Sequence, residues 1–382
     1  MNCAQNTRRR WGPSSLWITG LSCALWALQA APVELTAATE FRTALPGYTY
    51  HFPFDHGSHD DFQTEWWYYT GHLRDANGRP FGYQLTFFRR GVAREAASTN
   101  PSRWALRHLY FAHFALTDEA GRRFQFMEKI SRAGIRKAGA ETGRLAVWID
   151  DWRVEADGDA QVLQAQGEGI AIRLRLTPKK PPVIHGTAGL SRKGEGPGES
   201  SHYYSLTRLG TEGTLTYEGK SRSVSGLSWM DHEFGSNQLG ASQIGWDWFA
   251  LQLTDTTELM VYRIRRSDGT IEPASGGTWV RADGSAVPLT RAAITVEELD
   301  HWQSPQSRGM YPARWRLTVP SAHLSVEIVP TIPQQELLTR RSTHVTYWEG
   351  SVTVTGERAG RPVTGLGYVE LTGYAAPLRR RL

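Results

Sequence analysis

Two pairs of segments in this chain resemble each other in the same order, and this internal repeat constrains the fold more than any other feature. Residues 66–75 read WWYYTGHLRD and residues 246–255 read WDWFALQLTD, an offset of 180. Residues 224–231 read VSGLSWMD and residues 363–370 read VTGLGYVE, an offset of 139. Each half opens with an aromatic strand and closes with a glycine-containing strand that ends in a carboxylate, which predicts a duplicated unit.

Short segments rich in aromatic and β-branched residues follow one another through both halves, with turn sequences between them at hairpin spacing. No long segment shows helical periodicity, so we expect an all-β chain. Antiparallel strands of this kind either close into barrels, which leaves room for one small ligand, or stack as sandwiches. We expect two barrels, with bends at strand glycines such as Gly226, Gly365 and Gly373.

Residues 1–31 have the form of an export signal. Arg8, Arg9 and Arg10 precede an apolar run at residues 16–28, and small residues typical of a cleavage site follow. The run is shorter than the roughly 20 residues that span a bilayer. We therefore expect a periplasmic protein with a Sec or twin-arginine signal, and a lipoprotein signal at Cys23 is the less favoured alternative.

Two domains are expected after the signal, at residues 45–235 and 236–376, with the boundary between Phe234 and Ile244. A Gly-, Pro- and Lys-rich segment at residues 178–198 lengthens the first repeat. We expect this segment to form a surface excursion or a lid.

Composition excludes several classes of function. Both cysteines, Cys3 and Cys23, lie in the signal, so the rest of the chain has neither a disulfide nor a thiol nucleophile. The absence of a G-x-S-x-G motif argues against an α/β-hydrolase. Three of the 43 basic residues and none of the 38 acidic ones lie in the signal, so the remainder has a net charge of about +2. It has no basic stripe of the kind that nucleic-acid binding requires.

Aromatic side chains are abundant, with 15 Trp, 14 Tyr and 13 Phe. They favour an aromatic-lined interior and an apolar, lipid-like ligand. Stacking against carbohydrate is the alternative that this composition leaves open.

Residues 55–89, and above all the sequence EWWYYTGHL at residues 65–73, resemble the AttH/CrtC family of lipocalin-like proteins. The sequences GLSWMDHEFG at residues 226–235 and GWDWF at residues 245–249 strengthen the resemblance, which extends from about residue 48 to residue 374. It implies two lipocalin-like antiparallel β-barrel domains. The family includes carotenoid 1,2-hydratases, which add water to a terminal alkene without a cofactor, and exported proteins often encoded beside ABC-transporter permeases.

The resemblance to the hydratases implies that the acid that protonates the alkene corresponds to Asp231. An apolar aromatic pocket would keep such a carboxyl neutral near pH 7. The catalytic candidates are Asp231, Glu233 and Asp247. The candidates for ligand binding are Tyr204, Trp229, His232, Trp246, Trp248, Glu65 and Trp67.

Each candidate has a simpler structural explanation. Asp231 and Glu233 could hydrogen-bond turn backbone or pair with arginine at the domain junction. Plain core packing accounts for Glu65 and Trp67, since both faces of their strand carry aromatic residues. Asp247 fits a buried salt-bridge partner better than a second acid.

Residues 55–61 read DHGSHDD and suggest a metal site, but the spacing of His56 and His59 fits no zinc motif. His51 and His113 could join them only in three dimensions. We expect a solvated loop ordered by Asx turns, with no metal and no cofactor.

Two functions follow from these expectations. The first is a non-catalytic carrier of an apolar, terpenoid-like ligand, which works with an ABC-type permease and has the membrane surface as a further partner. The alternative is a cofactor-free hydro-lyase of the carotenoid 1,2-hydratase type, for which the export signal weighs against a carotenoid as substrate.

Overall fold

The computed structural model describes residues 40–92, 106–196, 198–236 and 240–378, so the expected signal at residues 1–31 lies outside the described residues. Nearly all regular structure is β-strand, as predicted. The described residues also form the 3₁₀ helices η1 (Phe54–His56), η3 (Arg291–Ala293) and η4 (Pro320–Ala322). No helix in these ranges is long and apolar enough to cross a membrane.

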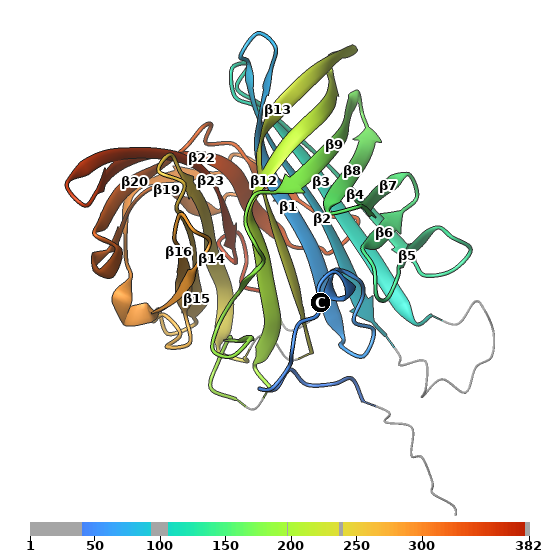
Figure 1. The fold of residues 1–382 in the computed structure, drawn as a ribbon, viewed down its shortest axis with the longest axis horizontal. Helices are drawn as coiled ribbons and strands as arrows, with labels where there is room; N and C mark the ends of the chain where they lie inside the picture. Colours follow the sequence, from blue (N-terminus) through green and yellow to red (C-terminus); the bar gives the residue numbers. More distant parts are fainter. Residues whose placement is uncertain (1–39, 93–105, 197, 237–239, 379–382) are drawn as a thin grey trace, which may run out of the picture. The chain divides into compact units, whose positions relative to one another are not determined.

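The first sheet contains the first repeat and has 13 antiparallel strands, which run from blue through green to yellow-green in Figure 1. Its spatial order is β4 (Arg123–Arg132), β3 (His108–Asp118), β2 (Pro80–Gly91), β1 (Thr64–Asp75), β13 (Lys220–Gly235), β12 (Ser200–Tyr217), β9 (Ile170–Pro178), β8 (Ala160–Gly167), β7 (Trp152–Asp157), β6 (Ala146–Ile149) and β5 (Ala138–Ala140). Two short strands pair with β12, namely β10 (Val183–Ile184) and β11 (Leu190–Arg192).

The second sheet contains the second repeat and has 10 strands. Its order is β17 (Ala286–Thr290), β16 (Gly276–Val280), β15 (Glu258–Arg266), β14 (Gln243–Leu253), β23 (Arg361–Thr372), β22 (Thr346–Arg358), β20 (Leu324–Pro330), β19 (Met310–Val319) and β18 (Thr295–Gln303). Strand β21 (Glu336–Leu338) pairs with β22.

The order from β17 to β18 repeats the order from β4 to β7, with β14 in the place of β1 and β23 in the place of β13. Both sheets are strongly curved, and one is nearly closed while the other is a half-barrel (Figure 1). The predicted all-β fold and internal duplication are therefore confirmed. The two-domain division stays a prediction, because the described residues belong to one compact unit.

Each sheet encloses an apolar core on its concave side. Trp67 and Tyr69 belong to the first core, and Trp315 and Trp348 to the second. A third apolar cluster joins the sheets and includes Tyr68, Trp229, Trp248 and Tyr368. Strands β1, β13, β14 and β23 are therefore covered on both faces, which explains why their sequences are apolar without strict alternation.

The segment at residues 178–198 is not a surface excursion, contrary to expectation. Its strands β10 and β11 pair with β12, and His185 is 1% exposed. Lys180 Nζ lies 2.7 Å from Glu258 Oε2 of the second sheet. Pairing and burial thus hold this segment against both sheets.

Candidate active site

The paired strands β1 and β13 divide the predicted site residues between two faces. Tyr68 lies beside Asp231, and Trp67 lies beside His232. Because side chains alternate along a strand, these two pairs point in opposite directions. The Trp67 ring stacks on His232 inside the first sheet, whereas the Tyr68 ring meets Trp248 of the second sheet, with centroids 5.0 Å apart.

Asp231 lies between the two sheets and is 4% exposed. It accepts three hydrogen bonds, which come from Tyr203 Oη (2.6 Å), Trp229 Nε1 (2.6 Å) and Ser205 Oγ. Burial raises the pKa of Asp231 from 3.8 to about 7, although the three donors oppose this shift. Near neutral pH this carboxyl therefore exists both with and without its proton.

A chain of neutral groups continues behind Asp231. Ser205 Oγ lies 2.6 Å from His185 Nε2, and His185 Nδ1 lies 2.8 Å from Thr278 Oγ1 of β16. Burial lowers the pKa of His185 to about 3, so one ring nitrogen donates and the other accepts. A protonated Asp231 can donate to Ser205, whose own hydrogen then goes to His185. The protonated acid thus has a complete set of partners.

The second sheet presents two more carboxyl groups to the same place. Glu349 of β22 is paired with Glu370 of β23, which lies beside Trp248 of β14. Tyr68 Oη donates to Glu349 across the sheets, and Trp246 Nε1 donates to Glu370 Oε2 at 2.8 Å. Burial, and then repulsion by the other carboxyl groups, raises the pKa of Glu370 to about 7 and that of Glu349 well above its usual range.

The three carboxyl groups accept hydrogen bonds from neutral donors. Within the described ranges, no Lys or Arg forms an ion pair with Asp231, Glu349 or Glu370, and their hydrogen bonds come from hydroxyl and indole groups. Uncompensated burial raises the pKa of these groups, because it disfavours the charged form. Such a cluster can donate a proton near neutral pH and can stabilise a positive charge.

Aromatic rings enclose the carboxyl groups. Trp229 and Trp248 meet edge to face, with centroids 6.3 Å apart. Trp66, Trp246 and Tyr262 pack against the cluster but remain partly exposed, so they mark the edge at which it meets solvent. We call this group the intersheet site and define it as Tyr68, Tyr203, Trp229, Asp231, Trp248, Glu349 and Glu370. All of its members are buried except Glu370, which is partly exposed.

Glu233 shares the face of Asp231 on β13, but it is ion-paired. Lys193 Nζ lies 3.0 Å from Glu233 Oε1, and Ser201 Oγ donates to the same oxygen at 2.5 Å. Lys193 also lies over the rings of Tyr203 and Tyr262, at 5.0 Å and 4.7 Å from their centroids. Glu233 therefore borders the intersheet site as the partner of a lysine.

Asp247 lies on the opposite face of β14 from Trp246 and Trp248. Arg265 Nε lies 3.0 Å from its carboxylate, and Tyr374 Oη donates to it at 3.0 Å. The structure therefore places Asp247 in a buried salt bridge inside the second sheet, away from Asp231.

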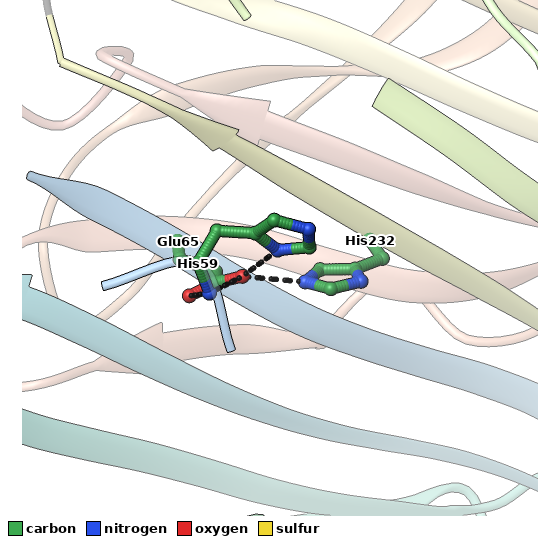
Figure 2. Close-up of side chains that lie close together, drawn as sticks. All are labelled: His59, Glu65 and His232. Atoms are coloured by element: carbon green, nitrogen blue, oxygen red, sulfur yellow. Dashed lines mark hydrogen bonds and ion pairs between the residues drawn. The ribbon is translucent and has the colours of Figure 1, made fainter. Parts of the chain in front are cut away.

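Glu65 belongs to a second buried polar group, inside the first sheet. Figure 2 shows the rings of His59 and His232 directed at the same carboxylate, and His59 Nδ1 and His232 Nε2 each lie 2.8 Å from Glu65 Oε1. Arg89 Nε lies 3.0 Å from Glu65 Oε2. Although burial opposes it, Arg89 and the two histidines hold the pKa of Glu65 well below its usual range.

Tyr204 extends the same group and does not reach Asp231. Its hydroxyl lies 3.0 Å from His232 Nδ1 and 2.6 Å from His56 Nδ1. The loop at residues 55–61 is packed into this group, with Asp55 1% exposed, so the expectation of a solvated loop is wrong. We call His59, Glu65, Arg89, Tyr204 and His232 the interior polar group.

The ligand atoms of His59, Glu65 and His232 lie within 4.8 Å of one another, which is close enough for a metal ion. The arrangement fits protons better. Glu65 already pairs with the Arg89 cation. Burial lowers the pKa of His59, but its hydrogen bonds to Asp55 and Glu65 outweigh burial and raise that pKa. A metal ion would have to displace these protons beside a fixed positive charge.

Neither Glu349 nor Glu370 was proposed as a site residue from the sequence, although the repeat contained a signal for Glu370. The offset of 139 aligns Glu370 with Asp231. Glu349 has the strand position that Ser205 has in the first sheet, since each is paired with the repeat-related acid. Only the packing of the two sheets brings the three carboxyl groups together.

Comparisons with known proteins cover nearly the whole described chain. Residues 43–374 match the AttH-like family. The solved structure of a putative AttH from Nitrosomonas europaea is 35% identical and has a TM-score of 0.79, over 87% of this chain and 99% of that one. Kievitone hydratase from Nectria haematococca is 16% identical, with a TM-score of 0.67 over 88% of this chain and 97% of its own. CghA is 14% identical, with a TM-score of 0.51 over 83% and 90%. No match was found among curated proteins.

Proposed function

This chain belongs to the AttH-like family, as its motifs predicted, and from that premise we propose that it is a cofactor-independent acid catalyst. Asp231 donates a proton to a carbon–carbon double bond of an apolar, isoprenoid-like substrate, and water captures the resulting tertiary cation. The net reaction joins alkene and water to give an alcohol. This is the hydro-lyase alternative, which we now prefer to the non-catalytic carrier.

One observation carries the proposal: the Asp231 carboxyl is buried beside an aromatic cluster, and the hydrogen bonds it accepts come from neutral groups. Protonation of an alkene needs a neutral acid, and the pKa of Asp231, about 7, provides a large fraction of that form. The hydrogen bonds from Tyr203, Trp229 and Ser205 stabilise the carboxylate that remains after proton transfer.

The cation that forms after protonation needs a surrounding that is apolar and electron-rich. The rings of Tyr68, Trp229 and Trp248 belong to one cluster around Asp231. Each ring face is expected to stabilise a nearby cation by about 0.5–2 kcal/mol. No Lys or Arg of the described chain pairs with Asp231, Glu349 or Glu370. The ammonium of Lys193, which borders the site over Tyr203, is paired with the Glu233 carboxylate.

Relatives support the proposal at two levels. The motif resemblance to carotenoid 1,2-hydratases assigns their acid to the position of Asp231. Kievitone hydratase and CghA share the fold at low identity, and CghA has also been solved with Sch210972. At this identity they support the fold and not the reaction.

The non-catalytic carrier is the second candidate, and it depends on the export signal and on the expected ABC-type permease. Both lie outside what the structure describes. Three solvent-open hollows of about 570, 780 and 840 Å³ lie at the surface, and no residue of the intersheet site lines them. A bound native lipid in the purified protein would favour the carrier.

The test compares wild type with Asp231→Asn on three neutral isoprenoid alkenes, citronellol, geraniol and squalene, in D₂O. Wild type should form a tertiary alcohol that carries deuterium on the neighbouring carbon. Asp231→Asn keeps the shape of the side chain but not the acid, and alcohol formation should fall by about 10²–10⁴-fold.

Glu336→Gln is the matched control. Glu336 is a buried carboxyl of the second sheet that accepts hydrogen bonds from Ser304 and Tyr311, and it lies outside the intersheet site. Unchanged turnover by Asp231→Asn would contradict the proposal. So would the absence of alcohol and of deuterium with all three alkenes, together with a tightly bound native lipid.

A further inference from the structure

The duplication gives Asp231 a counterpart on the facing sheet. Glu370 has the position in β23 that Asp231 has in β13, and Trp248 has the position in β14 that Tyr68 has in β1. Tyr68 is the direct neighbour of Asp231, and Trp248 is the direct neighbour of Glu370. The two carboxyl groups therefore extend from equivalent strands toward one aromatic cluster.

Short contacts connect the two sides. Trp248 Nε1 donates to Tyr203 Oη at 3.1 Å, and Tyr203 Oη donates to Asp231 at 2.6 Å. The charge of Asp231 also raises the pKa of Glu370, so the two groups lie near enough to interact electrostatically. The rings of Tyr68 and Trp248 meet edge to face between these strands.

We propose that Glu370 is the second catalytic group of this site and that it accepts a proton from the water molecule that captures the cation. This inference rests on the proposed function of Asp231. In the first step the O–H bond of Asp231 breaks and a C–H bond forms on the alkene. In the second step a C–O bond forms, a water O–H bond breaks, and its proton moves to Glu370. Exchange with solvent then returns a proton to Asp231 and removes one from Glu370.

Glu370 suits this role better than the other two carboxyl groups nearby. Glu349 is 2% exposed and already accepts a hydrogen bond from Tyr68, and burial raises its pKa well above its usual range, so it lies away from entering water. Glu233 is paired with Lys193. Glu370 instead receives a hydrogen bond from Trp246, which lies at the solvent edge of the site, where water can enter.

The electrostatics provide a donor and an acceptor at the same time. Burial raises the pKa of Asp231 and of Glu370 to about 7, and the charge of Asp231 further disfavours that of Glu370. A pair of this kind holds about one proton between its members near neutral pH and titrates in two coupled steps. One carboxyl can therefore donate while the other accepts, which is the arrangement that adding water requires.

The experiment separates protonation from capture by water. Wild type, Asp231→Asn, Glu370→Gln and the control Glu336→Gln are incubated with citronellol in D₂O, and alcohol and recovered alkene are analysed by mass spectrometry. Glu370→Gln should form alcohol at least tenfold more slowly. Its recovered alkene should still gain deuterium, since Asp231 can protonate the double bond and then take back a proton.

Each outcome distinguishes the two proposals. Normal alcohol formation by Glu370→Gln, with Asp231→Asn inactive, would overturn the role of Glu370 and leave the proposed function intact. Loss of both alcohol and deuterium exchange in Glu370→Gln would also overturn that role, because Glu370 would then be needed for protonation. A wild type that transfers no deuterium would remove both.

A second variant covers the case in which Glu370→Gln does not fold. Trp246→Phe keeps an aromatic ring at a partly exposed position, but the ring is smaller and lacks the indole N–H that donates to Glu370. It should slow alcohol formation more than deuterium exchange. It should also shift the acidic limb of the pH profile upward, because Glu370 must lose its proton before it can accept one and its pKa rises without the indole donor. Equal slowing of both would contradict the inference.

Discussion

Glu65 and Asp231 are both buried on paired strands of the same sheet, yet their surroundings push their charges in opposite directions. Glu65 points into the interior polar group, where Arg89 and two histidines hold its pKa well below its usual range. Asp231 points into the intersheet site, where neutral donors cannot offset burial and its pKa rises to about 7. Burial alone therefore does not decide whether a carboxyl is ionised; its partners do.

The difference also separates structural from chemical roles. A paired and ionised carboxylate such as Glu65 cannot readily donate a proton, but its loss leaves other buried charges without partners. A carboxyl such as Asp231, which has no ion-pair partner in the described chain and a pKa raised to about 7, is available for proton transfer. The predictions below test this contrast, from the largest expected effect to the smallest.

The largest effect is expected from two isosteric replacements at pH 7. Glu65→Gln should lower the free energy of unfolding by about 3–5 kcal/mol, because it removes the buried carboxylate that pairs with the fully buried Arg89 and leaves only Asp60, which is 3.6 Å away and 46% exposed. Asp231→Asn should change it by less than about 1 kcal/mol, because it breaks no ion pair and keeps an acceptor for Trp229. Urea unfolding measures both values, and equal losses would refute the contrast.

The pH dependence of stability should differ in sign between the two groups. The pKa of Asp231 is higher in the folded than in the unfolded chain, so its stabilising contribution is present below about pH 4 and is lost as the pH rises to about 7. Glu65 has a lowered pKa, so its contribution is present above about pH 4 and is lost in acid.

Asp231→Asn should therefore gain about 2 kcal/mol of stability relative to wild type between pH 5 and pH 7. Urea unfolding at both pH values measures this gain. Asp231 is also faced by Glu233, Glu349 and Glu370 and by the neutral His185, so the variant's own pH dependence must be recorded. A difference that stays constant with pH would show that Asp231 is ionised in the folded protein.

A smaller effect is expected when one donor to Asp231 is removed. Tyr203→Phe should cost about 1 kcal/mol and raise the pKa of Asp231 further, since Tyr203 donates to the carboxylate. Tyr311→Phe is the control, because Tyr311 donates to Glu336 instead. Carboxyl ¹³C NMR titration of the two variants should show a higher Asp231 pKa only in Tyr203→Phe.

The smallest effect is expected at a surface ion pair. Arg316 lies 3.0 Å from Glu297 and 3.1 Å from Glu327, with 46% of its side chain exposed. Arg316→Met should change the free energy of unfolding by less than about 1 kcal/mol, and by still less in high salt. A loss as large as that of Glu65→Gln would mean that burial is not what makes the Arg89 pair important.

The sequence predicted the fold more completely than the site. Its short aromatic strands, and the two pairs of similar segments that occur in the same order, predicted the all-β duplication. Its motifs predicted the family. The alternation of residues 65–69 also implied that Glu65 and Tyr68 face opposite ways. It did not show which face meets the second sheet, so Glu65, Trp67, Tyr204 and His232 were grouped with Asp231.

Strand periodicity is local, and a linear pattern of residues is enough to establish it; this is why sheets, repeats and faces could be inferred before the structure. The protonation of a carboxyl is different, because it depends on every charge and dipole within a few ångströms after folding. Tyr68 and Glu349 are 281 residues apart along the chain and bond across two sheets. Only that packing decided that three acids share an aromatic site without a cation.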